Sequence, residues 1–181
     1  MNRIEGLRRL LEAGEGCGAA GANRLGPGGE INRAGTGASL EAYLRRPGDA
    51  DFLANIEPGV APLVRIMTER LGWLTYTSCE GHRGPPLRER HLGLVARTPA
   101  EGAAMVNRLA PACRRANLGA RHVRLALTLI AAETELGPWP CLDLYFHAMT
   151  QASPEAYFAA ADRLQARLVA RLEAGRPLEV E

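Results

Sequence analysis

Hydrophobic and polar side chains alternate with a period of two in four segments of the chain, at residues 73–79, 91–97, 122–130 and 141–149. This period is typical of β-strands that bury one face. Apolar residues three or four positions apart predict a helix over residues 58–71. Two further helices begin at Thr98-Pro99 and Ser153-Pro154, where a capping side chain precedes a first-turn proline.

The order of these elements is helix, two strands, helix, two strands, helix. Consecutive strand pairs separated by helices favour an α+β fold. We expect two layers, with one mostly antiparallel or mixed four-stranded sheet, helices on one face and a polar open face.

The chain is expected to contain a single folded domain between two less ordered ends. Residues 1–50 combine a short helix over residues 4–13, a glycine-rich flexible segment and a second short helix near residues 39–44. Residues 51–175 form the α+β domain, and residues 176–181 form a C-terminal tail. The glycines of residues 16–21 match the Gly-x-Gly-x-x-Gly pattern of dinucleotide-binding loops. Such a loop follows a strand, and no strand is predicted before these residues, so a linker is favoured.

Alternation divides the predicted strands into two faces. The face expected to lie under the helices carries apolar side chains: Leu74, Tyr76, Leu92, Leu94, Ala96, Val123, Leu125, Leu127, Leu129, Leu142, Leu144 and Phe146. The opposite face carries mostly polar or titratable side chains: Thr75, Thr77, Cys79, His91, Val95, Arg97, Arg124, Ala126, Thr128, Asp143, Tyr145 and His147. Such a titratable cluster favours a functional face over a merely solvated one.

Composition narrows the possible chemistry. The 181 residues are 46% hydrophobic, enough for a core, and contain no lysine, which excludes Schiff-base chemistry and a phosphate-loop lysine. The four cysteines are widely spaced, so we expect reduced thiols and exclude a zinc site built from paired cysteines. The sequence has no secretory signal or membrane-spanning apolar run, so a cytoplasmic protein without membrane contact is expected.

The segment Thr77-Ser78-Cys79-Glu80-Gly81-His82-Arg83-Gly84 ends the first predicted strand and is the main candidate site. Cys79 could act as a nucleophile whose thiolate is favoured by His82 or Arg83. It could instead bind zinc or iron together with His82 and either His91 or His147, or serve only in packing. Glu80 is a candidate general base or a partner of Arg83.

The remaining candidates are binding residues for a substrate or cofactor: Thr77, Ser78, Gly81, Arg83, His91, Arg124, Asp143, Tyr145 and His147. Cys113 and Cys141 are expected to be buried. Arginines at residues 114–115 and 121–124 form a basic patch, which suits phosphate contacts and equally an ordinary helix end.

The stretch Tyr76-Thr77-Ser78-Cys79-Glu80-Gly81-His82 resembles a Thr-Ser-Ser-Cys-Ser-Gly-Arg motif. That motif belongs to the family that performs a late methyl transfer in wybutosine synthesis on transfer RNA. The resemblance implies an S-adenosylmethionine-dependent transferase in which Ser78, Cys79 and Gly81 match the family's serine, cysteine and glycine. Glu80 and His82 replace the family's serine and arginine, which changes the charge of the pocket.

Three functions follow from these observations. The first is a small enzyme with a Cys/His-centred pocket, performing group transfer on a nucleotide, transfer RNA or polar small molecule. The second is a metal-dependent enzyme that uses zinc or iron. The third is a noncatalytic module that binds a partner, or forms a homo-oligomer, through the open sheet face.

Overall fold

The computed structural model describes residues 56–96, 98–132, 139–149 and 152–174. The helices expected at residues 4–13 and 39–44, the glycine-rich segment, Cys17 and the C-terminal tail lie outside these residues. Among the helices of the described ranges, none has the length and apolar character needed to cross a membrane.

Each element predicted between residues 58 and 174 is present. The helices are α2 (Ala61–Arg65), which continues as the π-helix η4 (Ile66–Arg70), α3 (Pro99–Ala116) and α4 (Pro154–Ala174). The strands are β1 (Leu74–Cys79), β2 (His91–Val95), β3 (Val123–Ala132) and β4 (Trp139–Ala148).

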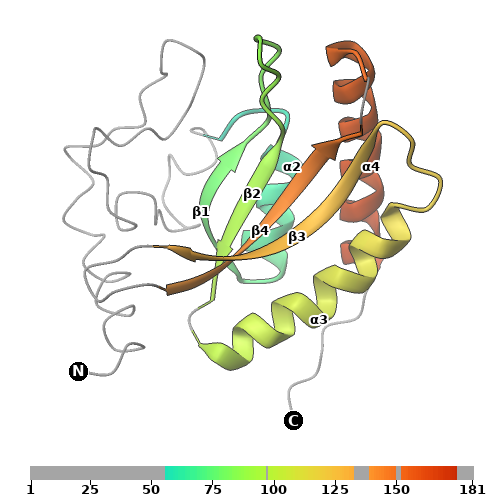
Figure 1. Cartoon of the computed structure of the whole chain (residues 1–181). Helices are drawn as coiled ribbons and strands as arrows, with labels where there is room; N and C mark the ends of the chain where they lie inside the picture. The colour runs from blue at the N-terminus through green and yellow to red at the C-terminus, as the bar shows by residue number, and fades with distance from the viewer. Residues whose placement is uncertain (1–55, 97, 133–138, 150–151, 175–181) are drawn as a thin grey trace.

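The four strands form one sheet in the order β1-β2-β4-β3 (Figure 1), and every neighbouring pair is antiparallel. The hairpin of β3 and β4 returns to the sheet so that β4 lies beside β2, with β3 at the edge. The predicted α+β class is confirmed, and the sheet is antiparallel rather than mixed.

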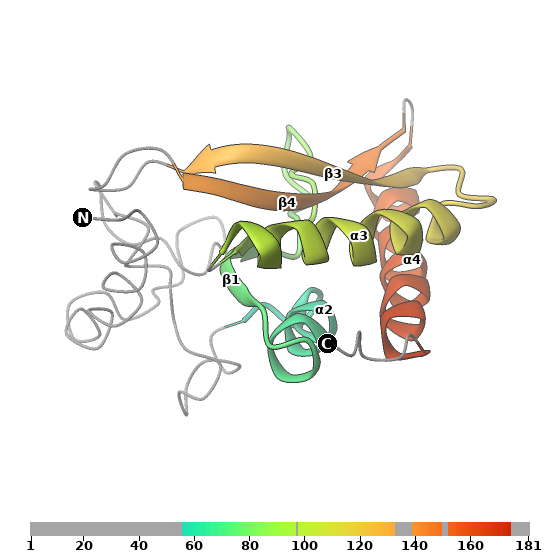
Figure 2. The same ribbon diagram turned by 90° about the horizontal axis from the view of Figure 1, so that it is seen from below.

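The helices cover one face of this sheet (Figure 2), and the core lies between the two layers. On the sheet side, the core side chains include Leu92, Leu94, Leu144 and Phe146. On the helix side, it is built from Leu63, Met67, Met105, Leu109, Cys113, Tyr157, Ala161, Leu164 and Leu168. The predicted burial of Cys113 and Cys141 is confirmed, and Cys79, Cys113 and Cys141 are all free thiols.

Both long helices start where the sequence predicts. The Thr98 hydroxyl accepts a hydrogen bond from the Glu101 N–H at 3.1 Å, with Pro99 in the first turn of α3. The Ser153 hydroxyl accepts one from the Ala156 N–H at 3.2 Å at the start of α4. These contacts satisfy backbone donors that have no partner within the helix.

A register shift in β1 changes which of its side chains face the helices. Thr75 lies opposite Leu94 on the helix-covered face, whereas Thr77 lies opposite Gly93 and Cys79 opposite His91. The assignment of Thr75 to the polar face is therefore wrong, because an irregularity between Thr75 and Thr77 adds a residue that simple alternation does not count.

The same shift moves Leu74. It lies opposite Val95 and not on the helix-covered face, so its predicted placement is also wrong. Thr77 and Cys79, which follow the irregularity, keep the face that alternation gives them.

The sheet face away from the helices is polar, but it is not evenly exposed. Arg124, Thr128 and His147 are exposed, whereas Cys141 and Asp143 are buried. Leu129, which alternation assigns to the covered face, is 72% exposed. It lies near the C-terminal end of the edge strand β3, and its side chain is exposed although its partner Leu142 is buried.

Tyr157 joins the two layers through its hydroxyl group. The hydroxyl accepts a hydrogen bond from the Arg90 N–H at 2.6 Å and donates one to the Phe146 carbonyl at 2.8 Å. Its side chain is fully buried, and burial raises the pKa of Tyr157 to about 12, so it stays protonated. The hydroxyl thus fixes α4 against the start of β2.

Substituting Tyr157→Phe should lower the free energy of unfolding by about 1–3 kcal/mol, because a buried N–H group and a buried carbonyl each lose a partner. Urea denaturation measures this change. An unchanged midpoint and slope would show that water or a local shift replaces both bonds.

Candidate functional site

The candidate site begins where β1 ends and the chain turns into the loop toward β2. Gly81 has φ +88°, and a Cβ at this position would lie 2.8 Å from the Arg88 carbonyl oxygen and 3.0 Å from the Arg90 nitrogen. His82 and Arg88 then exchange two backbone hydrogen bonds of 3.0 Å each. The loop therefore folds back on itself and needs glycine at residue 81.

Three potential ligand groups converge beside this loop. Cys79 Sγ lies 3.4 Å from His82 Nε2, and the same nitrogen lies 3.5 Å from Glu57 Oε1. One ligand atom from each side chain lies within 4.8 Å of the other two. We call these residues the Glu57–Cys79–His82 group.

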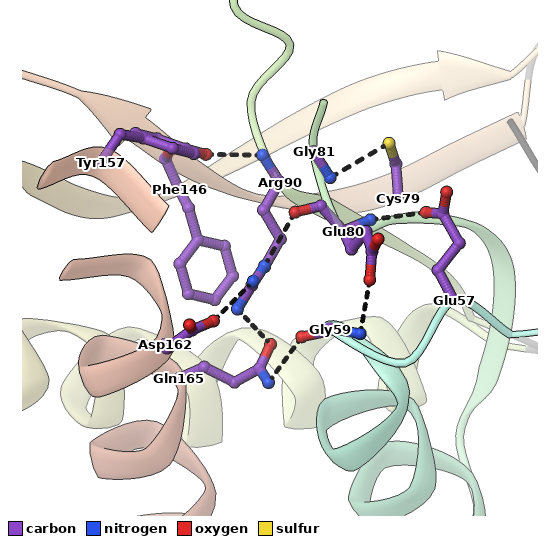
Figure 3. Close-up of polar contacts among 10 residues, drawn as sticks. All are labelled: Glu57, Gly59, Cys79, Glu80, Gly81, Arg90, Phe146, Tyr157, Asp162 and Gln165. Carbon is purple, nitrogen blue, oxygen red and sulfur yellow. Dashed lines mark hydrogen bonds and ion pairs between the residues drawn. The ribbon is translucent and has the colours of Figure 1, made fainter. Parts of the chain in front are cut away.

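Backbone N–H groups orient two members of the Glu57–Cys79–His82 group (Figure 3). The Glu80 N–H donates to Glu57 Oε2 at 2.7 Å, which leaves Oε1 toward His82. The Gly81 N–H donates to Cys79 Sγ at 3.4 Å. The turn after β1 thus positions both the carboxylate and the sulfur.

The Glu80 carboxylate points to a different segment. Its Oε2 accepts a hydrogen bond of 2.6 Å from the Gly59 N–H, and a Cβ on Gly59 would lie 2.6 Å from that oxygen. Arg83, the alternative partner expected for Glu80, places its guanidinium 5.2 Å from the centre of the Phe158 ring. Glu80 therefore ties the site loop to the turn before α2.

Arg90 ties the same loop to α4, although only 2% of it is exposed (Figure 3). Its Nε donates to the Glu80 carbonyl at 3.1 Å, Nη1 to Gln165 Oε1 at 3.2 Å and Nη2 to Asp162 Oδ1 at 2.7 Å. Gln165 in turn donates to the Gly59 carbonyl at 2.9 Å. One guanidinium thus connects the site loop, helix α4 and the turn that follows Glu57.

Burial affects the protonation of the Glu57–Cys79–His82 group. It raises the pKa of Glu57, partly offset by the Glu80 N–H. Burial also raises the pKa of the Cys79 thiol, and the nearby Glu57 carboxylate adds to the increase. Without a bound cation, this environment disfavours the thiolate that a cysteine nucleophile requires.

A second polar group lies on the sheet face to which Cys79 belongs. Thr77 Oγ1 lies 3.5 Å from His91 Nε2. The His91 and Tyr145 rings are 5.5 Å apart, and the Tyr145 and His147 rings are stacked at 5.3 Å with an angle of 4° between their planes. Burial lowers the pKa of His91, which favours its neutral form.

Two carboxylates contact the residues of this second group that lie on β4: Glu89 contacts His147, and Asp143 contacts Tyr145. Glu89 Oε2 lies 2.7 Å from His147 Nδ1, and Glu89 Oε1 accepts a hydrogen bond from the Ala148 N–H. The Tyr145 hydroxyl donates to Asp143 Oδ2 at 3.3 Å, and burial, followed by the negative charge of Asp143, raises the pKa of Tyr145.

The structure therefore divides the predicted site residues. Cys79 and His82 lie together, but Glu57 joins them in place of His91 or His147. His91 lies beside Thr77 and His147 beside Glu89, and both rings contact Tyr145. Arg124 lies opposite His147 at the exposed edge of the sheet. Ser78 lies opposite Leu92 on the helix-covered side, away from Thr77 and Cys79.

Two important residues are absent from the sequence-based candidates. Glu57 lies 23 positions before Glu80, whose N–H it binds, and no local pattern links the two. Arg90 stands between Glu89 and His91 in an arginine-rich loop, where the sequence gives no sign that one guanidinium is buried. The only feature of the sequence that could have singled out Arg90 is its position directly before a predicted strand.

Comparison with known proteins adds no further assignment. No protein family, curated protein or solved structure shows significant similarity to this chain. The functional argument therefore depends on the geometry of the residues themselves.

Substituting Gly81→Ala should lower the free energy of unfolding by about 2–4 kcal/mol, since it combines a left-handed backbone with a steric overlap. Gly72→Ala is the matched control, because Gly72 also has a positive φ of 66° but has no atom within 4 Å of an added Cβ.

Gly72→Ala should cost only about 1–2 kcal/mol. Gly84→Ala, at an exposed position that also has space for a Cβ, should change stability by less than about 0.5 kcal/mol. Chemical denaturation of the three variants tests this order. Equal losses for residues 72 and 81 would contradict the proposed close packing of the loop.

Substituting Arg90→Met should lower the free energy of unfolding by about 2–4 kcal/mol, because Gln165 and the Glu80 carbonyl lose a buried donor. Asp162→Asn is the control. It should cost about 1 kcal/mol or less, since the Asp162 side chain is 64% exposed and the amide oxygen can still accept a hydrogen bond. If both variants lost similar amounts of unfolding free energy, the ion pair with Asp162, and not the hydrogen bonds to Gln165 and Glu80, would make the main contribution of Arg90 to stability.

Proposed function

We propose that the Glu57–Cys79–His82 group binds a divalent transition metal, with zinc as the preferred ion, and that this metal centre carries the protein's chemistry. Thiolate, imidazole and carboxylate are the three ligand types that zinc accepts in proteins. The observation that carries the proposal is the convergence of Cys79 Sγ and Glu57 Oε1 on one atom, His82 Nε2.

Two of the three distances between these atoms match those in tetrahedral zinc sites. Zn–S bonds of about 2.3 Å and Zn–N or Zn–O bonds of about 2.0–2.2 Å place neighbouring ligand atoms roughly 3.4–3.6 Å apart. The measured separations are 3.4 Å from sulfur to nitrogen and 3.5 Å from nitrogen to oxygen. A cation would also offset the accumulation of a thiolate and a carboxylate in one half-buried place.

The same convergence favours a metal over a nucleophilic triad. In a triad the histidine contacts the nucleophile through one ring nitrogen and the acid through the other, so that a proton can be relayed. Here Nε2 of His82 faces both Cys79 and Glu57. This arrangement is typical of three ligands directed at one metal ion, and not of a histidine that transfers a proton between a nucleophile and an acid.

The contacts around the group also suit a metal centre. Ligands of catalytic metals are commonly held by a further layer of hydrogen bonds, which fixes their orientation. The Glu80 N–H holds Glu57 and the Gly81 N–H points at Cys79, while Arg90 holds the carbonyl side of the same turn. Two of the three ligands are thus anchored by backbone groups that cannot rotate away.

Three protein ligands are typical of catalytic zinc, because a fourth position stays open for water or substrate. Zinc in such a centre supplies Lewis acidity and can activate water at neutral pH. Thr77, His91 and Tyr145 lie on the sheet face shared by Cys79 and offer hydrogen-bonding groups to a polar substrate. Hydrolysis of a polar small molecule is the reaction class that this arrangement supports best.

Methyl transfer from S-adenosylmethionine, implied by the resemblance at residues 76–82, stays a prediction. No contact among the described residues favours it over hydrolysis. Binding of S-adenosylmethionine by calorimetry would support it, and the metal experiment below is independent of that result.

The full chain, prepared without chelators, should contain or take up one zinc ion per molecule. The cobalt(II)-substituted protein should show a thiolate-to-metal charge-transfer band in the near ultraviolet, because Cys79 supplies sulfur to the metal. Cys79→Ser should abolish that band. Glu57→Gln and His82→Gln should weaken metal affinity by at least about 100-fold, since even outer contacts of metal ligands contribute 10–100-fold.

Cys113→Ala and Glu89→Gln are the matched controls, since they remove a thiol and a carboxylate outside the group. Both variants should retain the charge-transfer band and the affinity of the unmodified chain. A chain that takes up neither zinc nor cobalt in stoichiometric amount would overturn the proposal. So would a charge-transfer band that persists in Cys79→Ser.

A further inference from the structure

A cavity lies between the turn that leads from α3 into β3 and the middle of α4. Its volume is about 180 Å³. Nine residues line it: Gly119, Ala120, Arg121, His122, Val123, Ala160, Arg163, Leu164 and Arg167. We call it the arginine cavity. It shares no residue with the Glu57–Cys79–His82 group.

The lining combines three arginines with apolar side chains. Arg121, Arg163 and Arg167 contribute three guanidinium groups, and none of the nine lining residues is acidic. Arg163 and Arg167 are one helical turn apart on α4, a spacing at which like charges repel. Among the described ion pairs, none involves these three arginines. An anion placed in the cavity would relieve this repulsion.

The wall formed by the turn is held in place by specific contacts. Gly119 has φ +73°, which lets the chain reverse after α3. The Asn117 side chain then donates to the Leu125 carbonyl at 2.9 Å and accepts from the Leu125 N–H at 2.8 Å. Arg167 donates from Nη1 to the Leu118 carbonyl at 3.2 Å, which links α4 to the turn.

These contacts prepare the cavity for a ligand. The bond from Arg167 uses one of five guanidinium N–H groups and fixes the side chain at the rim of the cavity. Arg121 and Arg163 are exposed, and no hydrogen bond or ion pair to another residue of the described ranges holds their guanidinium groups, so these can turn toward an anion. The apolar floor of Val123 and Leu164 lowers the local dielectric and strengthens such contacts.

We infer that the arginine cavity binds the phosphate group of a small phosphorylated ligand. Planar guanidinium groups donate paired hydrogen bonds that match the oxygens of phosphate. The volume is smaller than the roughly 300–1,000 Å³ of pockets that enclose a whole ligand. The cavity therefore holds a phosphate-sized group, while the remainder of the ligand lies outside over α4 and the turn.

The test is calorimetric titration of the full chain with inorganic phosphate and with pyrophosphate, at constant ionic strength in sodium chloride. Pyrophosphate should bind more tightly than phosphate because it adds charge. The double variant Arg121→Gln with Arg163→Gln should weaken pyrophosphate affinity by at least about tenfold, because each lost charge-assisted hydrogen bond corresponds to about tenfold or more. This variant keeps the Arg167 bond to Leu118, so the cavity wall should persist.

The matched control is Arg65→Gln with Arg70→Gln, two exposed arginines on α2 and η4 outside the cavity. It removes the same net charge and should keep pyrophosphate affinity within about twofold, since distant charges are screened. Urea denaturation of both double variants checks that they remain folded.

Three results would overturn the inference. The unmodified chain could bind neither phosphate nor pyrophosphate. Both double variants could weaken binding equally, which would indicate general charge attraction. A short RNA oligonucleotide could bind with steep salt dependence while pyrophosphate does not, which would indicate a surface for an extended nucleic-acid backbone.

Discussion

The structure depends on one buried cation, the guanidinium of Arg90. Removing a charge from water is unfavourable unless its hydrogen-bonding groups find partners. Arg90 finds three partners in two segments: the Glu80 carbonyl in its own loop, and Gln165 and Asp162 on the distant helix α4. The geometry of the loop after β1 is therefore set by α4, more than 70 residues later in the chain. Gln165 extends the same link to Gly59, two positions from Glu57.

This network has a function that a hydrophobic contact could not supply. Apolar residues of similar volume often stabilise a fold as well as a buried ion pair does, but they pack without fixed direction. The hydrogen bonds of Arg90 and Glu80 have direction, and they bring Glu57 from the segment before α2 to the side of Cys79. Apolar burial holds the helices against the sheet. The polar network gives the Glu57–Cys79–His82 group its direction.

The same distinction, between apolar burial and directed polar contacts, explains which features could be predicted from the sequence. Alternation along each strand and the caps at Thr98 and Ser153 are local signals, and they place the strands, the long helices and the antiparallel sheet correctly. The irregularity after Thr75 has no side-chain signature, so the face of Thr75 is predicted wrongly. Glu57 enters the site only through contacts between distant segments. His91 and His147 share the predicted face, yet their rings have partners of their own.

Helix α4 connects the two sites through the way its charges are distributed. Its sequence holds three acidic residues, Glu155, Asp162 and Glu173, and only Asp162 lies near the middle of the helix. Asp162 pairs with Arg90 on the side that faces the loop after β1. Arg163 lies about 100° further round the helix and Arg167 about 140°, because each residue rotates by about 100°. The one carboxylate near the middle of α4 thus lies beside Arg90, on a different side of the helix from Arg163 and Arg167. The two sides of α4 therefore differ in charge, and the side at the arginine cavity carries the positive charge that an anionic ligand would recognise.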